Sequence, residues 1–107
     1  MTRPQLLLIH GALGAAIQFD PLLPLVENEF DVHTLDLEGH ARTPLKERPL
    51  RIEYFAQDVL EYLDSRDIQA VDIFGHSLGG QIGLHLAGFF PDSPVHGYQH
   101  HPSALRR

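Results

Sequence analysis

The sequence has 107 residues, enough for one small domain with a modest core. A formal net charge of −6, with no basic stripe, argues against nucleic acid and anionic membranes as partners. The sequence contains no cysteine, which excludes disulfides and thiol chemistry, and the apolar run at residues 6–9 is too short for a signal peptide or a membrane span. We therefore expect a cytoplasmic protein.

The first expected strand covers residues 5–9, QLLLI. It is apolar without alternation, which is typical of a strand covered on both faces in a parallel sheet. The next segment, residues 10–14, reads HGALG. Its two glycines let a backbone N–H point at a ligand in the crevice above the sheet. The alternative is an ordinary strand-to-helix turn, because glycine is common in turns.

A short helix is expected over residues 20–28. Asp20 is a suitable cap, and Pro21 suits the first turn of a helix. The apolar positions expected to form its buried stripe are Leu22, Leu23, Leu25 and Val26. A second buried strand is expected within residues 30–37, and its carboxyl end lies at the same edge of the sheet as that of the first strand.

Residues 41–50 contain two prolines and are expected to form a solvated connector. The helix with the clearest pattern follows. Its apolar residues recur at the spacing of one helical face: Ile52, Phe55, Ala56, Val59, Leu60 and Leu63. The other face carries four acidic residues, Glu53, Asp58, Glu61 and Asp64. We expect that acidic face to be in water, as charged helix faces usually are.

The strongest chemical signal lies in residues 70–83. An apolar strand at residues 71–74 leads into GHSLG, residues 75–79, and then into a helix rich in small residues, expected over residues 78–90. Gly-x-Ser-x-Gly between a strand and a helix is typical of a nucleophile elbow, in which a strained turn holds the serine hydroxyl above the sheet. The start of the helix also favours an oxyanion beside Ser77. The alternative is that Ser77 only caps the helix.

Alternating strands and helices predict an α/β fold, here an incomplete three-stranded parallel sheet with helices on both faces, formed by residues 1–91. After Pro91 the apolar periodicity stops, so residues 92–107 are expected to be an irregular tail, which a frameshift near residues 91–93 would explain. This tail holds three of the eight histidines, His96, His100 and His101. With no fourth ligand and no rigid frame, we expect no metal site there.

Three motifs in this order resemble the N-terminal part of the α/β-hydrolase fold superfamily, over about residues 4–91. HGALG at residues 10–14 matches the oxyanion loop of that family. DLEGH at residues 36–40 is similar to its Asp-x-x-Gly-His-Gly turn, and GHSLGG at residues 75–80 matches its nucleophile elbow. The resemblance implies that the sequence holds the part of an α/β-hydrolase domain that includes this elbow.

The same resemblance implies that Ser77 is the nucleophile and that the backbone N–H groups of Ala12 and Leu78 form the oxyanion hole. A serine here, where the dehalogenase branch has aspartate, implies cleavage of an ester, thioester, amide or related carbon–carbon bond in a small-molecule substrate, without a cofactor. The residues of the supporting motifs are His10, Gly11, Gly75, His76 and Gly79.

The chain departs from the family pattern in two ways. Ala41 replaces the second glycine of the Gly-His-Gly turn, which would tighten or shift that loop. The triad acid and histidine, which follow the nucleophile in this family, are not identified. Asp92 is the only acid after Ser77, and a helix of about a dozen residues would place it roughly 20 Å away.

None of the histidines is expected to act as the base for Ser77. His85 lies about two turns down the following helix, roughly 12 Å away. His76 is adjacent to Ser77 in the chain and points elsewhere. His10 and His40 lie at the correct edge of the sheet, but the family uses these positions structurally.

Three hypotheses follow. The first, which we favour, is a serine hydrolase represented by a truncated chain that is inactive alone. The second is a minimal hydrolase completed by a second copy or partner, because the apolar strand at residues 71–74 would be an exposed edge that invites pairing. The third is a non-catalytic interaction module that keeps the fold.

Overall fold

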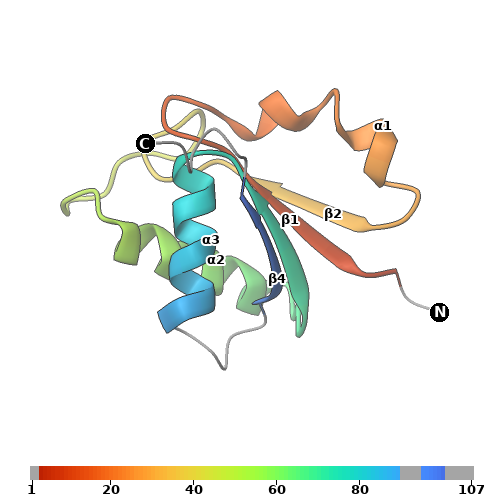
Figure 1. Cartoon of the computed structure of the whole chain (residues 1–107). Coiled ribbons are helices and arrows are strands. Elements are labelled where there is room, and N and C mark those ends of the chain that lie inside the picture. The colour runs from red at the N-terminus through yellow and green to blue at the C-terminus, as the bar shows by residue number, and fades with distance from the viewer. Residues whose placement is uncertain (1–2, 90–94, 101–107) are drawn as a thin grey trace.

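The computed structural model describes residues 3–89 and 95–100. Figure 1 shows a twisted parallel sheet with strand order β2-β1-β3-β4, α2 and α3 on one face and the α1 segment on the other. The strands are β1 Gln5–Ile9, β2 Asp31–Leu35, β3 Val71–Gly75 and β4 Val95–His100. The helices are the 3₁₀ turn η1 Ala16–Phe19, α1 Leu23–Val26, α2 Ile52–Ser65 and α3 Leu78–Phe89. The predicted α/β class and parallel sheet are confirmed.

Strand β1 lies between β2 and β3. Leu7 pairs with His33 on one side and with Ile73 on the other, both in parallel. Its last three residues, Leu7, Leu8 and Ile9, are almost completely buried. This explains the unbroken apolar run, because a central parallel strand has no face that water can reach.

The main hydrophobic core lies between the sheet and helices α2 and α3. The sheet contributes residues that alternate along a strand, such as Leu7 and Ile9 of β1. The helices contribute residues one turn apart, such as Val59 and Leu63 of α2. Each such side chain stabilises the fold by roughly 1.5–3 kcal/mol when removed from water. The amphipathic pattern that predicted α2 is therefore confirmed.

The segment between β1 and β2 differs from the expected helix over residues 20–28. It contains η1, in which Phe19 is buried, and the short helix α1, in which no residue is buried and Leu25 is largely exposed. Pro24 occupies the second helical position of α1. Proline has no N–H, so Pro24 cannot donate the hydrogen bond to the Asp20 carbonyl that a regular helix starting at Asp20 would need.

Strand β4 was not predicted. It pairs in parallel with β3, with an irregular register between Val71 and Asp72. The expectation of three strands is therefore wrong by one strand, and residues 95–100 are not irregular. The sequence pattern does not predict this strand because parallel pairing uses backbone N–H and C=O groups, which any residue other than proline supplies without apolar alternation.

The pairing of β4 also overturns the expected exposed edge at residues 71–74, because β3 has neighbours on both sides. Within the described sheet the edge strands are β2 and β4. Asp92 and His101 lie outside the described residues, as do the side chains of His96 and His100. The expectations that involve these four residues stay predictions.

The described residues contain neither a membrane-spanning helix nor a metal-binding cluster. None of the helices there has the length and apolar character needed to cross a bilayer. Among the same residues, no group of three or more histidines and carboxylates is placed to hold a metal ion.

Ala41 has a φ of 48°, in the left-handed region that glycine adopts easily. It lies in the turn after β2, where the family motif has its second glycine. The Cβ of an L-residue in this conformation approaches the carbonyl oxygen, which costs roughly 1–2 kcal/mol. The loop keeps the backbone conformation that glycine would adopt, so Ala41 is in a strained conformation.

We predict that Ala41→Gly raises the free energy of unfolding by about 1 kcal/mol, because it removes this strain at some cost in chain entropy. Denaturant unfolding followed by circular dichroism measures the change. Ala87→Gly, at an exposed position of α3, is the matched control and should lower stability by about 1 kcal/mol. Equal losses in both variants would contradict a strained Ala41.

Candidate active site

Ser77 lies at the bend between β3 and α3 with a φ of 54°. Two hydrogen bonds fix the bend: the His76 N–H donates to the Ile9 carbonyl at 3.0 Å, and the Gly79 N–H donates to the His76 carbonyl at 2.9 Å. A serine that only caps a helix has extended backbone geometry. The left-handed φ at Ser77 therefore argues against the simple capping interpretation.

Glycines allow the bend because no side chain fits inside it. A Cβ at Gly75 would overlap the backbone of Gly79 and Gly80. A Cβ at Gly79 would overlap the carbonyl of Ile9. The first turn of α3 therefore lies directly against the end of β1. Steric overlap explains why both flanking positions of Gly-x-Ser-x-Gly are glycine.

The loop after β1 lies against the same bend. A Cβ at Gly11 would be 3.2 Å from the Cβ of Ser77 and 3.1 Å from the Cδ2 of His76. Ala12 follows at the same edge of the sheet. Within the described residues, the N–H groups of Ala12 and Leu78 donate no hydrogen bond to the protein. Leu78 begins α3, so its N–H is one of those that a helix leaves unpaired.

His10 is completely buried and joins the ends of β1 and β2. Its Nδ1 donates to the Gly11 carbonyl at 2.7 Å, and its Nε2 accepts from the Leu37 N–H at 3.0 Å. Burial lowers the pKa of His10, and this effect is larger than the opposite effect of the Gly11 hydrogen bond. The neutral ring is the form that these two contacts require.

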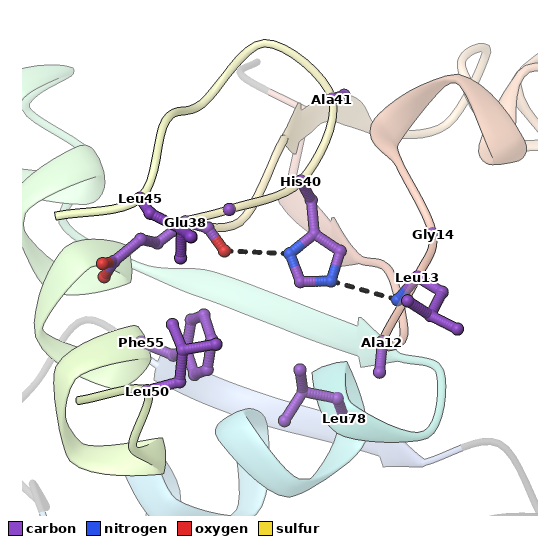
Figure 2. Close-up of a pocket in the computed structure, with 11 residues that line it drawn as sticks. Ala12, Leu13, Gly14, Glu38, His40, Ala41, Leu45, Leu50, Phe55 and Leu78 are labelled. Atoms are coloured by element: carbon purple, nitrogen blue, oxygen red, sulfur yellow. Dashed lines mark hydrogen bonds between the residues drawn. The ribbon is translucent and has the colours of Figure 1, made fainter.

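His40 connects the same two loops further from the sheet. Its Nε2 accepts from the Leu13 N–H at 3.0 Å, and its Nδ1 donates to the Glu38 carbonyl at 2.9 Å (Figure 2). The rings of His10 and His40 lie 5.0 Å apart. Both nitrogens of each ring are hydrogen-bonded to the backbone, so neither ring has a nitrogen left for Ser77.

The structure thus brings together one group of the predicted site residues at the carboxyl edge of the sheet. These residues are His10, Gly11, Ala12, Gly75, His76, Ser77, Leu78 and Gly79. His85 lies on α3, two turns beyond Ser77. Among the described residues, no hydrogen bond connects an imidazole to the Ser77 hydroxyl.

A charged cluster that sequence reasoning missed lies under the loop at residues 41–50. The carboxylate of Glu38, almost completely buried, accepts from the Arg48 guanidinium at 2.7 Å and from the Lys46 N–H at 2.8 Å. Arg48 also pairs with Asp58 of α2 at 2.8 Å, and the Lys46 ammonium lies 3.1 Å from Asp58. The loop is therefore an anchored segment, and Asp58 is not simply solvated.

The sequence held a weak signal for this cluster. Cationic residues at positions 46 and 48 lie between two carboxylate-bearing elements, but charge spacing across a loop has no fixed period. The pairing therefore becomes apparent only from the fold.

A family model described as "alpha/beta hydrolase fold" matches residues 4–98. The chain belongs to the α/β-hydrolase fold family. Among the solved structures similar to this family member is a hydrolase from Pseudomonas aeruginosa PA01, with a TM-score of 0.82 and 29% identity, covering 87% of this chain and 35% of that one.

Two curated relatives show the same relation in sequence. A pimeloyl-[acyl-carrier protein] methyl ester esterase of Neisseria meningitidis serogroup C is 38% identical over 85 residues, which cover 79% of this chain and 31% of that protein. A pyrethroid hydrolase of Sphingobium wenxiniae is 36% identical over 96 residues, which cover 86% of this chain and 33% of that protein. The present α/β-hydrolase chain spans about a third of the length of these relatives.

We predict that Gly79→Ala destabilises the protein by about 3 kcal/mol or more, because its Cβ would overlap the backbone at the end of β1. Thermal and denaturant unfolding measure the loss. Gly88→Ala, in the same helix, is the control: a Cβ there meets nothing within 4 Å, so alanine should stabilise α3 by up to about 1 kcal/mol. Similar effects at the two positions would contradict the close packing at the elbow.

The ion pair of Glu38 predicts a pH dependence of stability. Hydrogen bonds from Arg48 hold the pKa of Glu38 below its ordinary value of 4.5, although burial acts in the opposite direction. The folded protein therefore binds fewer protons here than the unfolded chain. The stabilisation is present above pH 4.5 and is lost as the pH falls through the lower pKa of the folded state.

We therefore expect the difference in unfolding free energy between the wild type and Glu38→Gln to be largest above pH 4.5 and to shrink in more acidic solution. Arg48→Met, which removes the main cause of the lowered pKa, should reduce this pH dependence. A difference that stays constant with pH would show that the Glu38 carboxylate titrates alike in both states.

Proposed function

We propose that this chain carries the nucleophile and the oxyanion-binding half of a serine hydrolase that cleaves small-molecule esters or thioesters. The observation that carries the proposal is the φ of 54° at Ser77, inside a bend whose glycines leave no room for a Cβ. Such strain is characteristic of functional sites, where it holds a side chain in a required position. Gly-x-Ser-x-Gly in this strand–turn–helix setting is the pattern of a nucleophile elbow.

The reaction has two steps. Ser77 Oγ attacks the substrate carbonyl carbon, its proton passes to a base, and the carbonyl oxygen becomes an oxyanion. The N–H groups of Ala12 and Leu78 donate to that oxygen, and the positive end of α3 adds to the stabilisation. The alcohol or thiol then leaves as the acyl-serine forms, and water releases the acid and restores the hydroxyl.

His10 and His40 have a supporting role in this mechanism. His10 and His40 hydrogen-bond the loop that carries Ala12 to the loop after β2. They hold the Ala12 N–H at the edge where the oxyanion forms. Donors that are fixed in advance stabilise developing charge without reorganisation at the moment of reaction.

The proposed mechanism needs a proton acceptor from outside the described residues. His10 and His40 are fully hydrogen-bonded, and in hydrolases of this fold the acid and the histidine follow the nucleophile in the chain. The described residues are therefore expected to acylate only slowly, through positioning and oxyanion stabilisation. The names of the relatives, a methyl ester esterase and a pyrethroid hydrolase, support an ester as the substrate class.

Other expectations from the sequence stay predictions. They are the cytoplasmic location, the lack of nucleic-acid and membrane partners, and self-association. Self-association through β3 has lost its basis because β4 covers that edge, so a second copy would have to pair with β2 or β4. The choice between a hydrolase and a non-catalytic module depends on the reactivity of Ser77.

We predict that p-nitrophenyl acetate acetylates Ser77 in the presence of free imidazole, which supplies the base that the described residues do not provide. Acetylation of Ser77 should be on the order of a hundredfold faster than that of Ser65, because an oxyanion-hole donor contributes about this factor. Mass spectrometry of peptides from the quenched protein measures the adduct at each site. Nitrophenol release is unsuitable, since imidazole itself cleaves the ester.

Ser77→Ala should lose the rapid acetylation, and Ser65→Ala is the matched control that should keep it. Ser65 is exposed at the end of α2, where its hydroxyl donates to the Tyr62 carbonyl at 2.8 Å. Equal rates at the two serines in a folded protein would leave the hydrolase proposal without support and favour the non-catalytic module.

A further inference from the structure

A cavity of about 550 Å³ opens beside Ala12 and Leu78, the residues whose N–H groups are proposed to bind the oxyanion. We propose that it binds an uncharged apolar group of the substrate, with four or more carbons. This inference rests on the proposed function, because it places the substrate at the same site. The volume lies within the range of about 300–1,000 Å³ that is usual for small-molecule pockets.

The walls of the cavity are mostly hydrocarbon. Figure 2 shows Leu50, Phe55 and Leu78 on one side, with Leu45 across from them and Leu13 beside Ala12 at the right of the view. These side chains come from four separate segments, so the cavity is a product of the fold. An apolar group entering it would gain about 0.8 kcal/mol for each buried CH₂.

The polar side chains of the wall, Glu38 and His40, are already hydrogen-bonded. The Glu38 carboxylate points away from His40 in Figure 2, and it pairs with Arg48. Both ring nitrogens of His40 bind the backbone. A charged or strongly polar substituent would thus lose its water without gaining a partner, which disfavours it.

Three leucines at the cavity are costly without a ligand. Leu13, Leu45 and Leu50 are 97%, 65% and 55% exposed. Leu13 also has a φ of 65°, a conformation that a bulky residue rarely adopts. Its N–H is held by His40, so the strain positions an apolar side chain in water next to the reactive edge. An apolar ligand would cover these side chains.

The charged cluster positions the outer wall of the cavity. Leu45 and Leu50 lie on either side of Arg48 in the sequence, and the Arg48 guanidinium is held by both Glu38 and Asp58. Charge-assisted, bidentate contacts of this kind fix geometry as well as adding energy. Arg48 is therefore a positioning residue for the apolar wall, although it does not line the cavity.

Binding can be tested without any chemistry at Ser77. The isotope-labelled chain is titrated with 1-hexanol and, separately, with 6-amino-1-hexanol, which has the same length and carries a charge. We expect 1-hexanol to shift the amide resonances of Leu45, Leu50 and Leu78, and the amino alcohol to bind at least about tenfold more weakly, because its ammonium group would be desolvated. Ser77→Ala should bind 1-hexanol like the wild type.

Variants locate the binding site. Leu50→Asp puts a charge into the wall and should weaken 1-hexanol binding at least about tenfold, and Leu50→Trp should do the same by filling the space. The matched control is Leu25→Asp, another exposed leucine, which lies on α1 away from the cavity and should leave binding unchanged. Arg48→Met should weaken binding while Arg48→Lys partly restores it, if the ion pair positions the wall.

Three results would overturn the proposal. They are no shift at the cavity amides, equal affinity for the two alcohols, and shifts at Leu45 and Leu50 that depend on protein concentration without ligand, which would identify a second copy as the occupant. Hexanol binding without Ser77 acetylation would contradict only the hydrolase proposal.

Faster Ser77 acylation by p-nitrophenyl hexanoate than by the acetate would place the apolar group on the acyl side, and equal rates would place it on the alcohol side.

Discussion

The site depends on one steric constraint, which is the direct contact between the first turn of α3 and the end of β1. Gly79 has no room for a Cβ against the Ile9 carbonyl, and Gly75 has none against Gly79. This contact forces the bend at Ser77, and the hydrogen bond from His76 to Ile9 holds it. The hydroxyl and the loop after β1 therefore reach the same edge of the sheet together.

Two histidines hold the loops of the site together through hydrogen bonds. His10 joins β1 to the end of β2, and His40 joins the two loops above them. Burial keeps His10 neutral, so that one nitrogen donates and the other accepts. Histidines near a serine would ordinarily suggest an acid–base role, but here the ring nitrogens are occupied by the backbone.

Sequence reasoning located the elements with strong periodicity or steric necessity, namely β1, β3, α2 and the glycines around Ser77. It failed where pairing depends on the backbone alone, as in β4, and where a single residue such as Pro24 interrupts a helix. It also missed the Glu38–Arg48–Asp58 cluster and the apolar cavity, because both are assembled from segments with no fixed spacing. The motifs of the site are short and continuous in sequence, so they could be predicted. The cavity walls around them are formed by tertiary contacts between distant segments, so they could not.

The central place of β1 also affects how the chain folds. Leu7 is synthesised before both of its strand partners, His33 and Ile73. Ile73 is more than half the chain away from it in sequence. Contacts between residues distant in sequence carry a large loop-closure cost and form slowly. During synthesis, β1 can pair with β2 early, but its other edge stays unpaired until β3 emerges, so this apolar edge is exposed to misassociation before the nucleophile bend can form.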